Sequence, residues 1–200
     1  MTPKSMLVTS EMMQAGVVPL LFTGGASNIQ SPTGPIRNPG RDPLAYWLDE
    51  QGWSYFDPQI HPDTHGRDYV WGLDGPQEKK AREMAKLRVY EIIPTTIAAV
   101  STLEIMDDAR RGRTSLVWFN DGRTFTPFGL GSLDELSRNE SLRLKVGDMV
   151  YYHLNAYIKA GNQLRSELLL MLADCPHIVF VNSFEELKTA ITFLLPRLLA

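Results

Sequence analysis

Short apolar runs alternate with segments of helical spacing along most of this chain, and this alternation constrains the fold more than any other feature. Strands that alternate with helices form a parallel sheet with helices on both faces, joined by right-handed crossovers. The sequence therefore predicts an α/β fold built on a five-stranded parallel sheet. The expected strands lie at residues 17–22, 53–60, 88–93, 114–119 and 177–181.

Capping residues mark where several of the helices begin or end. Asp42, followed by proline, is a typical cap and first turn, and Gly52 ends that helix. Gly112 ends another, and Ser183 with Glu186 forms a capping box that starts the last helix. The remaining helices are expected at residues 77–87, 98–111 and 158–173.

Two long polar segments, residues 27–40 and 61–76, follow the first two strands and are expected to be loops. In open α/β sheets, ligands bind outside the carboxyl ends of the strands. The segments expected at this rim are residues 24–28, 57–74, 94–104 and 120–123.

The chain has no internal repeat and no linker long enough to divide it. We expect residues 1–16 to form an N-terminal arm and residues 17–200 to form a single α/β domain. The arm contains several methionines without clear periodicity, so it is a candidate for apolar contact with a neighbouring subunit.

Charge and cysteine content narrow the range of partners. The 20 basic and 23 acidic residues are interspersed and give a net charge of -3, which disfavours binding to duplex nucleic acid. The apolar runs are too short to span a bilayer, so no membrane partner is expected. The single cysteine, Cys175, and the lack of a recognisable signal peptide favour a reducing, cytoplasmic location.

Glu104 is the most informative residue at the predicted rim. It would lie within the first two turns of the helix after the third strand, where the positive end of the helix dipole favours an ionised carboxylate. Such a group suits a nucleophile, and Ser101 and Thr102 would offer hydroxyls to a sugar or phosphate. The alternative is that Ser101 and Glu104 form an ordinary capping box.

Other polar and aromatic residues fall on the same rim. The turn after the first strand would bring backbone amides close to a ligand, unless it is only a tight turn. Trp71 and Tyr69 are candidates for stacking on a nucleobase, or for packing on the core. Asn120 would contact the base or a neighbouring site, or belong to an Asn-Asp-Gly turn. The turn residues are Gly24, Gly25, Ala26, Ser27 and Asn28.

Four stretches in this order and spacing resemble the nucleoside 2-deoxyribosyltransferase-like family, in particular its divergent second branch. They read LLFTGGASN, RDPLAYWLDEQGWSYFDPQI, EKKAREMAKLRVYEIIPTTIAAVSTLEIMDDA and SLVWFNDG, and they cover residues 17–123. The resemblance implies a flavodoxin-like sheet in which Glu104 attacks the anomeric carbon of a nucleoside. That branch usually has G-x-x-S-x-x-E, whereas Ala98 stands here at the position of the glycine.

The resemblance also implies a second acid that protonates the leaving base, and an oligomer. Asp57 is the first choice, because a strand end fixes a side chain better than a loop does. Asp74, Glu78 and Asp68 are further candidates, and each could instead be a solvated charge. Arg41 lies where the branch often has a Trp-Arg pair, so it is either a substrate contact or a surface charge. Family members usually share active sites between subunits, so we expect a homo-oligomer.

No cofactor or metal is expected. His61 and His65 have the spacing of helical metal ligands, but Pro62 and Gly66 disfavour a helix there and no third ligand stands out. Dinucleotide, phosphate-loop and Ser-His-Asp motifs are missing from the sequence.

Three functions are therefore compatible with the sequence. The first is cleavage or exchange of the N-glycosidic bond of a nucleoside or nucleoside monophosphate through a glycosyl-glutamate ester. The second is cleavage of NAD by a glycohydrolase, which would release nicotinamide. The third is a non-catalytic module that senses nucleotides or binds a partner. The identity of the base, the sugar and the 5′ group is left open.

Overall fold

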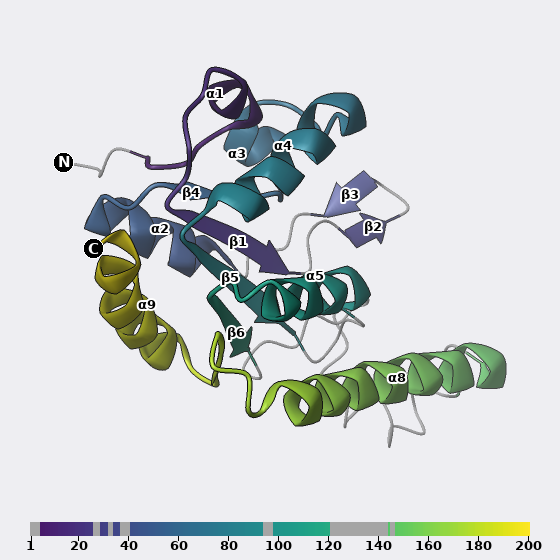
Figure 1. Ribbon diagram of the computed structural model, residues 1–200. Helices are drawn as coiled ribbons and strands as arrows, with labels where there is room; N and C mark the ends of the chain where they lie inside the picture. Colours follow the sequence, from purple (N-terminus) through teal and green to yellow (C-terminus); the bar gives the residue numbers. More distant parts are fainter. Residues whose placement is uncertain are drawn as a thin grey trace.

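A computed structural model describes residues 5–25, 29–31, 34–36, 41–93, 98–120, 144 and 147–200. Its centre is a five-stranded, all-parallel sheet in the order β4-β1-β5-β6-β7 (Figure 1). Counted along the chain, this is the order 2-1-3-4-5 of flavodoxin-like folds, as the sequence predicts. The strands are β1 (Leu21–Gly25), β4 (Tyr55–Phe56), β5 (Leu87–Ile92), β6 (Ser115–Phe119) and β7 (Ile178–Val181).

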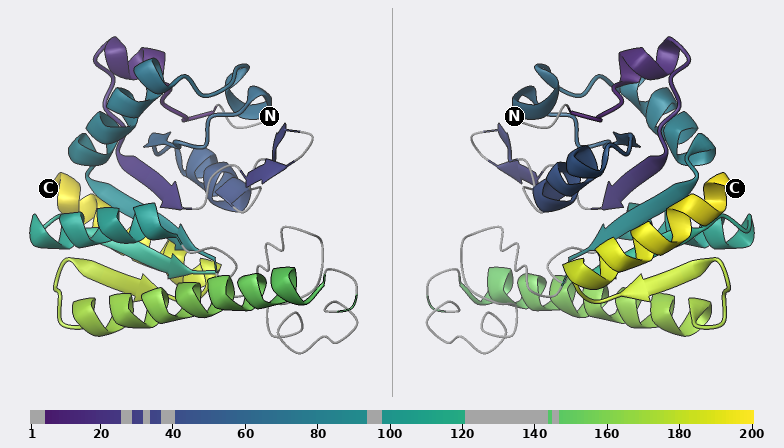
Figure 2. Two further views of the ribbon diagram at one scale, coloured as in Figure 1. Left: turned by 90° about the vertical axis from the view of Figure 1, so that its right-hand side faces the viewer. Right: turned by 90° about the vertical axis from the view of Figure 1, so that its left-hand side faces the viewer.

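Helices cover both faces of the sheet (Figures 1 and 2). One face carries α1 (Ser10–Gln14), α4 (Trp71–Met84), α5 (Ala99–Arg110) and the carboxyl-terminal part of α8 (Asp148–Leu172). The other face carries α2 (Asp42–Gln51) and α9 (Phe184–Leu199). The two faces therefore bury two separate apolar clusters against one sheet.

Successive residues of the strands enter opposite clusters, because side chains alternate across a sheet. Phe22, Tyr90 and Val117 pack under α4 and α5, whereas Val89 and Leu116 pack under α2 and α9. All these side chains are buried. Burial on both faces explains why the strands read as continuous apolar runs rather than as alternating ones.

The expected boundaries are shifted in several places, and α8 begins at Asp148 rather than at residue 158. The first strand begins at Leu21 rather than at residue 17, and β4 pairs over only two residues at the sheet edge. The segment expected as a loop at residues 61–76 contains the one-turn helix α3 (Pro62–His65) and the first turns of α4. The short strands β2 (Ile29–Ser31) and β3 (Gly34–Ile36) pair antiparallel within the other expected loop.

The amino-terminal segment packs on its own chain. Leu7 forms a parallel bridge with Tyr55 at the edge of the sheet. Val8 and Met13 are buried in the cluster under α4, and α1 lies beside α4 (Figure 1). Part of the expected arm is therefore core structure.

At the opposite edge, α8 runs beside α5 and extends past the strands (Figures 1 and 2). Its buried residues include Leu168 and Leu172, near its carboxyl end. Within the described ranges, none of the helices has both the length and the apolar composition that crossing a bilayer would need.

Candidate active site

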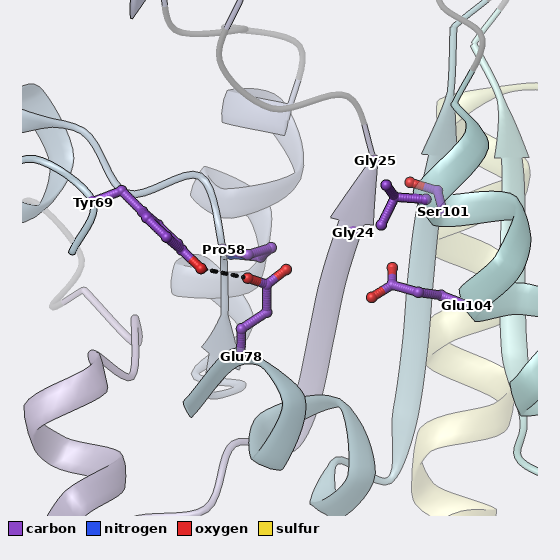
Figure 3. A pocket seen from close by; sticks show the side chains of 8 residues that line it. Gly24, Gly25, Pro58, Tyr69, Glu78, Ser101 and Glu104 are labelled. Atoms are coloured by element: carbon purple, nitrogen blue, oxygen red, sulfur yellow. Dashed lines mark hydrogen bonds between the residues drawn. The ribbon is translucent and has the colours of Figure 1, made fainter. Parts of the chain in front are cut away.

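A pocket of about 290 Å³ lies at the carboxyl edge of the sheet, beside the end of β1 (Figure 3). Side chains from α4 and α5 meet there with the loops that follow β4 and α3. This is the rim at which the sequence predicts a ligand site, and where open α/β sheets bind ligands in general. The lining residues are Gly24, Gly25, Pro58, Tyr69, Glu78, Val100, Ser101 and Glu104.

Gly24 and Gly25 form the sheet side of the pocket, and both positions require glycine. A Cβ on Gly24 would lie 2.6 Å from the ring of Tyr90, well inside van der Waals contact. Gly25 has a φ of 139°, a backbone conformation that other residues rarely adopt. The glycines thus allow the strand end to lie tightly against β5 and leave room for a ligand.

Helix α5 supplies two of the predicted residues, Ser101 and Glu104. Ala98 precedes the helix with a φ of 45°, so the left-handed conformation falls on the position where the resembled family usually has glycine. Ser101 is the third helical residue and Glu104 the sixth, and no side chain caps the helix. The alternative of a Ser101–Glu104 capping box is therefore wrong.

The protonation expected for Glu104 is corrected by its surroundings. Its side chain is 21% exposed, and burial raises its pKa from 4.5 to about 7. Arg82 opposes this rise, with its Nε 3.8 Å from Oε1 of Glu104, while nearby Glu78 and Asp108 add to it. The carboxyl is therefore poised between its two protonation states near neutral pH, rather than held firmly ionised by the helix dipole.

Glu78 is the second carboxyl of the pocket. Figure 3 shows the Glu78 and Glu104 side chains extending into the same space from α4 and α5. Burial is the main cause of a raised pKa at Glu78, and the Tyr69 hydroxyl opposes it by donating a hydrogen bond of 3.3 Å to Oε2. Two such groups in one cavity are the arrangement that proton transfer needs.

Asp57, the first choice for the second acid, is bound to another residue. Its carboxylate accepts the backbone N–H of Gln59 at 2.9 Å and lies 3.1 Å from Nη2 of Arg41. The Arg41 side chain is 2% exposed and also donates to the carbonyl of Thr23 at 3.1 Å. Arg41 is therefore not a surface charge, and the pair ties the end of β4 to β1.

Asp74 and Trp71 lie on α4 but are not among the pocket-lining residues. The Asp74 side chain is fully buried and accepts two hydrogen bonds from Arg67, at 2.7 and 2.8 Å. It also accepts the N–H of Val70 at 2.6 Å, so its oxygens are occupied within the protein. Trp71 is 80% exposed with its ring 6.3 Å from that of Tyr69, and of the two aromatic residues it is Tyr69 that lines the pocket.

The remaining predicted residues divide between the protein interior and undescribed ranges. Thr102 is turned back onto its helix, where its hydroxyl donates to the carbonyl of Ala98 at 3.0 Å. Asn120 is buried, and its side-chain amide donates a hydrogen bond of 2.7 Å to Oε1 of Glu91. Ala26, Ser27 and Asn28 lie outside the described residues.

No group of three or more His, Cys, Asp or Glu side chains within the described ranges is arranged to hold a metal ion. His61 instead caps the short helix α3, with Nδ1 accepting the N–H of Asp63 at 3.2 Å. That helix contradicts the expectation that Pro62 and Gly66 prevent one, since the proline occupies its first position and the glycine ends it.

The sequence offers Glu78 as one of several candidates for the acid and does not single out Arg82. The two residues are four apart on a charged helix, a spacing that places them on one face. This periodicity was the available signal for a functional face on α4. Pro58 and Val100 carry no distinctive signal and line the pocket because of the chain path alone.

Comparison with models of known protein families and with curated proteins gave no match to this chain.

Proposed function

We propose that this protein cleaves or exchanges the N-glycosidic bond of a nucleoside or nucleoside monophosphate, with Glu104 as the nucleophile. One observation carries the proposal: two half-buried glutamates, Glu104 and Glu78, line a single pocket at the ligand-binding edge of a parallel sheet. Glycoside chemistry of the retaining type needs such a pair of carboxyl groups in different protonation states.

The surroundings of the pair suggest which carboxyl is ionised. Arg82 lies beside Glu104 and favours its charged form, whereas the hydrogen bond to Glu78 comes from a neutral tyrosine. Two nearby carboxyls titrate as a coupled pair, so the proton that they share near neutral pH can reside on either one, and Arg82 favours the form in which it resides on Glu78. Glu104 is thereby assigned as the nucleophile and Glu78, in place of Asp57, as the acid.

In the proposed reaction, a carboxylate oxygen of Glu104 attacks C1′ while the bond from C1′ to the base nitrogen breaks. Glu78 transfers its proton to that nitrogen, so the base leaves neutral and Glu78 becomes a carboxylate. Glu78 then accepts a proton from water, or from the ring nitrogen of a second base, as that atom attacks C1′. The ester breaks and the Glu104 carboxylate is restored.

The volume of the pocket supports a small substrate. About 290 Å³ is just below the range of roughly 300–1,000 Å³ typical of small-molecule sites. Ser101, buried at the wall formed by α5, offers a hydroxyl near Gly25 for a sugar oxygen (Figure 3).

The test is a panel of ribonucleosides, 2′-deoxynucleosides, their 5′-monophosphates and NAD, each incubated with and without a second free base. Released and newly formed species are separated by chromatography. We expect turnover by the wild-type protein and a loss of at least about a thousandfold in Glu104→Gln, which keeps the shape but not the nucleophile.

Glu83→Gln is the matched control, because Glu83 is an exposed glutamate on α4 and is not among the pocket-lining residues. It should retain full activity. Equal activity in Glu104→Gln would reject the nucleophile. Release of nicotinamide from NAD alone would favour a glycohydrolase, and ligand binding without turnover in either protein would favour a sensing module.

A further inference from the structure

Arg82 connects the two helices that carry the pocket carboxyls. Arg82 lies on α4, and its Nη1 donates a hydrogen bond of 3.1 Å to the backbone carbonyl of Glu104. Its Nε lies 3.8 Å from the Glu104 carboxylate. The same guanidinium reaches Asp108 at 3.0 Å and Asp107 at 3.1 Å, both on α5. A single side chain thus contacts the backbone, the carboxylate and the next turn of the nucleophile's helix.

The partners of Arg82 are themselves held in place. Asp108 is fully buried. It accepts a hydrogen bond of 2.7 Å from the Tyr90 hydroxyl and one of 3.2 Å from Nη1 of Arg113. Asp107 is bound by Arg111 at 2.9 Å and by Arg110 at 3.2 Å. Arg82 is only 12% exposed, so its guanidinium has little freedom to turn to other partners.

The ion pair between Arg82 and Asp108 lies one helical turn further along both helices than the two pocket carboxyls. Glu78 and Arg82 are one turn apart on α4, and Glu104 and Asp108 are one turn apart on α5. The upper turn of each helix offers a carboxyl to the cavity, and the lower turn joins the helices through an ion pair. The contact between Arg82 and Asp108 therefore joins the two helices one turn away from the two pocket carboxyls.

We propose that Arg82 is a positioning residue for the reaction: it clamps α5 to α4, favours the charged form of the Glu104 carboxyl and directs that carboxyl into the cavity. This inference rests on the proposed function, but it makes a separate statement about Glu104 that holds whether or not turnover is observed.

Four charged groups act on Glu104 from the elements around it. Burial is the main cause of its raised pKa, and Glu78 from α4 and Asp108 from α5 raise it further. Arg82 is the chief opposing charge, with a smaller effect from Arg41. Removal of the Arg82 cation should therefore shift the titration of Glu104 upward, since an opposite charge at about 4–6 Å typically moves a carboxyl pKa by about 1–3 units.

The experiment compares Arg82→Gln, Arg82→Lys and the control Arg110→Gln in the full chain. Arg110 also contacts Asp107, but it is 75% exposed and touches neither pocket carboxyl. Glutamate labelled with ¹³C at the side-chain carboxyl is followed by NMR across pH, and the Glu104 signal is assigned by its loss in Glu104→Gln. In parallel, the pH profile of kcat/KM is measured.

We expect Arg82→Gln to raise the Glu104 midpoint and the acidic limb of the profile by about one unit or more. Activity at pH 6 should fall about tenfold or more on that account. Arg82→Lys keeps the charge but not the forked geometry, so its midpoint should stay close to that of the wild type while kcat falls. Arg110→Gln should change neither quantity.

An unchanged Glu104 midpoint in Arg82→Gln would overturn the inference, even if activity were lost, because a purely structural role would leave the titration in place. If Arg82→Gln fails to fold, Arg82→Lys decides the matter: a wild-type kcat would remove the positioning role. Absence of turnover in the wild-type protein contradicts the proposed function alone, since the NMR titration needs no substrate.

Discussion

Asp74 and Glu78 lie one turn apart on α4, and both side chains are largely removed from solvent. The pKa values of their carboxyl groups are nevertheless shifted in opposite directions. Burial raises the pKa of Asp74, but hydrogen bonds from Arg67 and from the N–H of Val70 outweigh it and lower the pKa to about 2. Glu78 receives one hydrogen bond from a neutral tyrosine, and burial raises its pKa.

The same contrast recurs on α5. Hydrogen bonds from Arg111 and Arg110 lower the pKa of Asp107, whereas burial raises the pKa of Glu104 one turn earlier to about 7. Burial alone therefore does not distinguish a carboxyl that holds the fold together from one available for chemistry. The two kinds of carboxyl differ in the number of charged partners that they have. The two carboxyls with raised pKa values, Glu78 and Glu104, meet in the same pocket.

The contrast on α4 predicts a large loss of stability in Asp74→Asn. This change leaves the partly buried Arg67 without its main counter-charge, and breaking such a pair costs about 3 kcal/mol. The contribution of Asp74 is present above its unfolded pKa near 3.8 and disappears as pH falls toward about 2. Urea unfolding at pH 7 and at pH 2.5, roughly the folded pKa, should show the difference between variant and wild type shrinking at acid pH. A stability difference between Asp74→Asn and wild type that does not change with pH would contradict this contrast between Asp74 and Glu78.

Glu104→Gln should raise the free energy of unfolding, which is the opposite of the effect of Asp74→Asn. The folded protein binds the Glu104 proton more tightly than the unfolded chain does, so stability is full below pH 4.5 and is lost as pH rises through about 7. Since each unit of pKa shift corresponds to about 1.4 kcal/mol, the variant should be more stable by roughly 3 kcal/mol at pH 8 and about equal to wild type at pH 4. Urea unfolding across this range tests the sign. A variant less stable than wild type at pH 8 would show that Glu104 belongs with the structural carboxyls.

Ala98→Gly should stabilise the protein by about 1 kcal/mol. Ala98 adopts a left-handed conformation, which costs a residue with a Cβ roughly 1–2 kcal/mol, and glycine avoids most of that cost. Ala99→Gly is the control, because Ala99 is the first residue of α5 and glycine there should not stabilise the helix. Thermal unfolding distinguishes the two. Equal effects would mean that no local backbone strain precedes α5.

Tyr69→Phe should have the smallest effect. It removes the hydrogen bond that favours the charged form of Glu78, so the alkaline limb of the activity profile should move up by less than about one unit. Activity at neutral pH should change only by about threefold or less. A downward shift of that limb would contradict the assignment of Glu78 as the acid.

The sequence predicts the sheet because burial on both faces leaves continuous apolar strands that are visible without any tertiary information. It fails where tertiary contacts decide. Residues 61–76 form a long polar segment that is expected to be a loop, yet α4 begins at Trp71 and includes Pro76. The ion pair between Arg67 and Asp74, together with the hydrogen bond that the N–H of Val70 donates to Asp74, stabilises that first turn.

The site shows the same limit. Glu104 is placed correctly because its position follows from the strand and helix order, but its protonation depends on burial and on Arg82, which local spacing does not reveal. The sequence favours Asp57 as the acid because this residue follows a strand. Its partner Arg41 lies 16 positions earlier in the sequence, and only the fold brings the two side chains within 3.1 Å.

The central claim is that Glu104 forms a covalent bond to C1′ of the sugar. The most direct measurement is mass spectrometry of the protein after brief incubation with a 2′-fluoro-2′-deoxynucleoside, whose fluorine slows hydrolysis of the ester. We expect a mass increase of one fluorinated sugar, located by proteolysis on the peptide that contains Glu104 and lost in Glu104→Gln. Base release accompanied by a label on a different residue would contradict it.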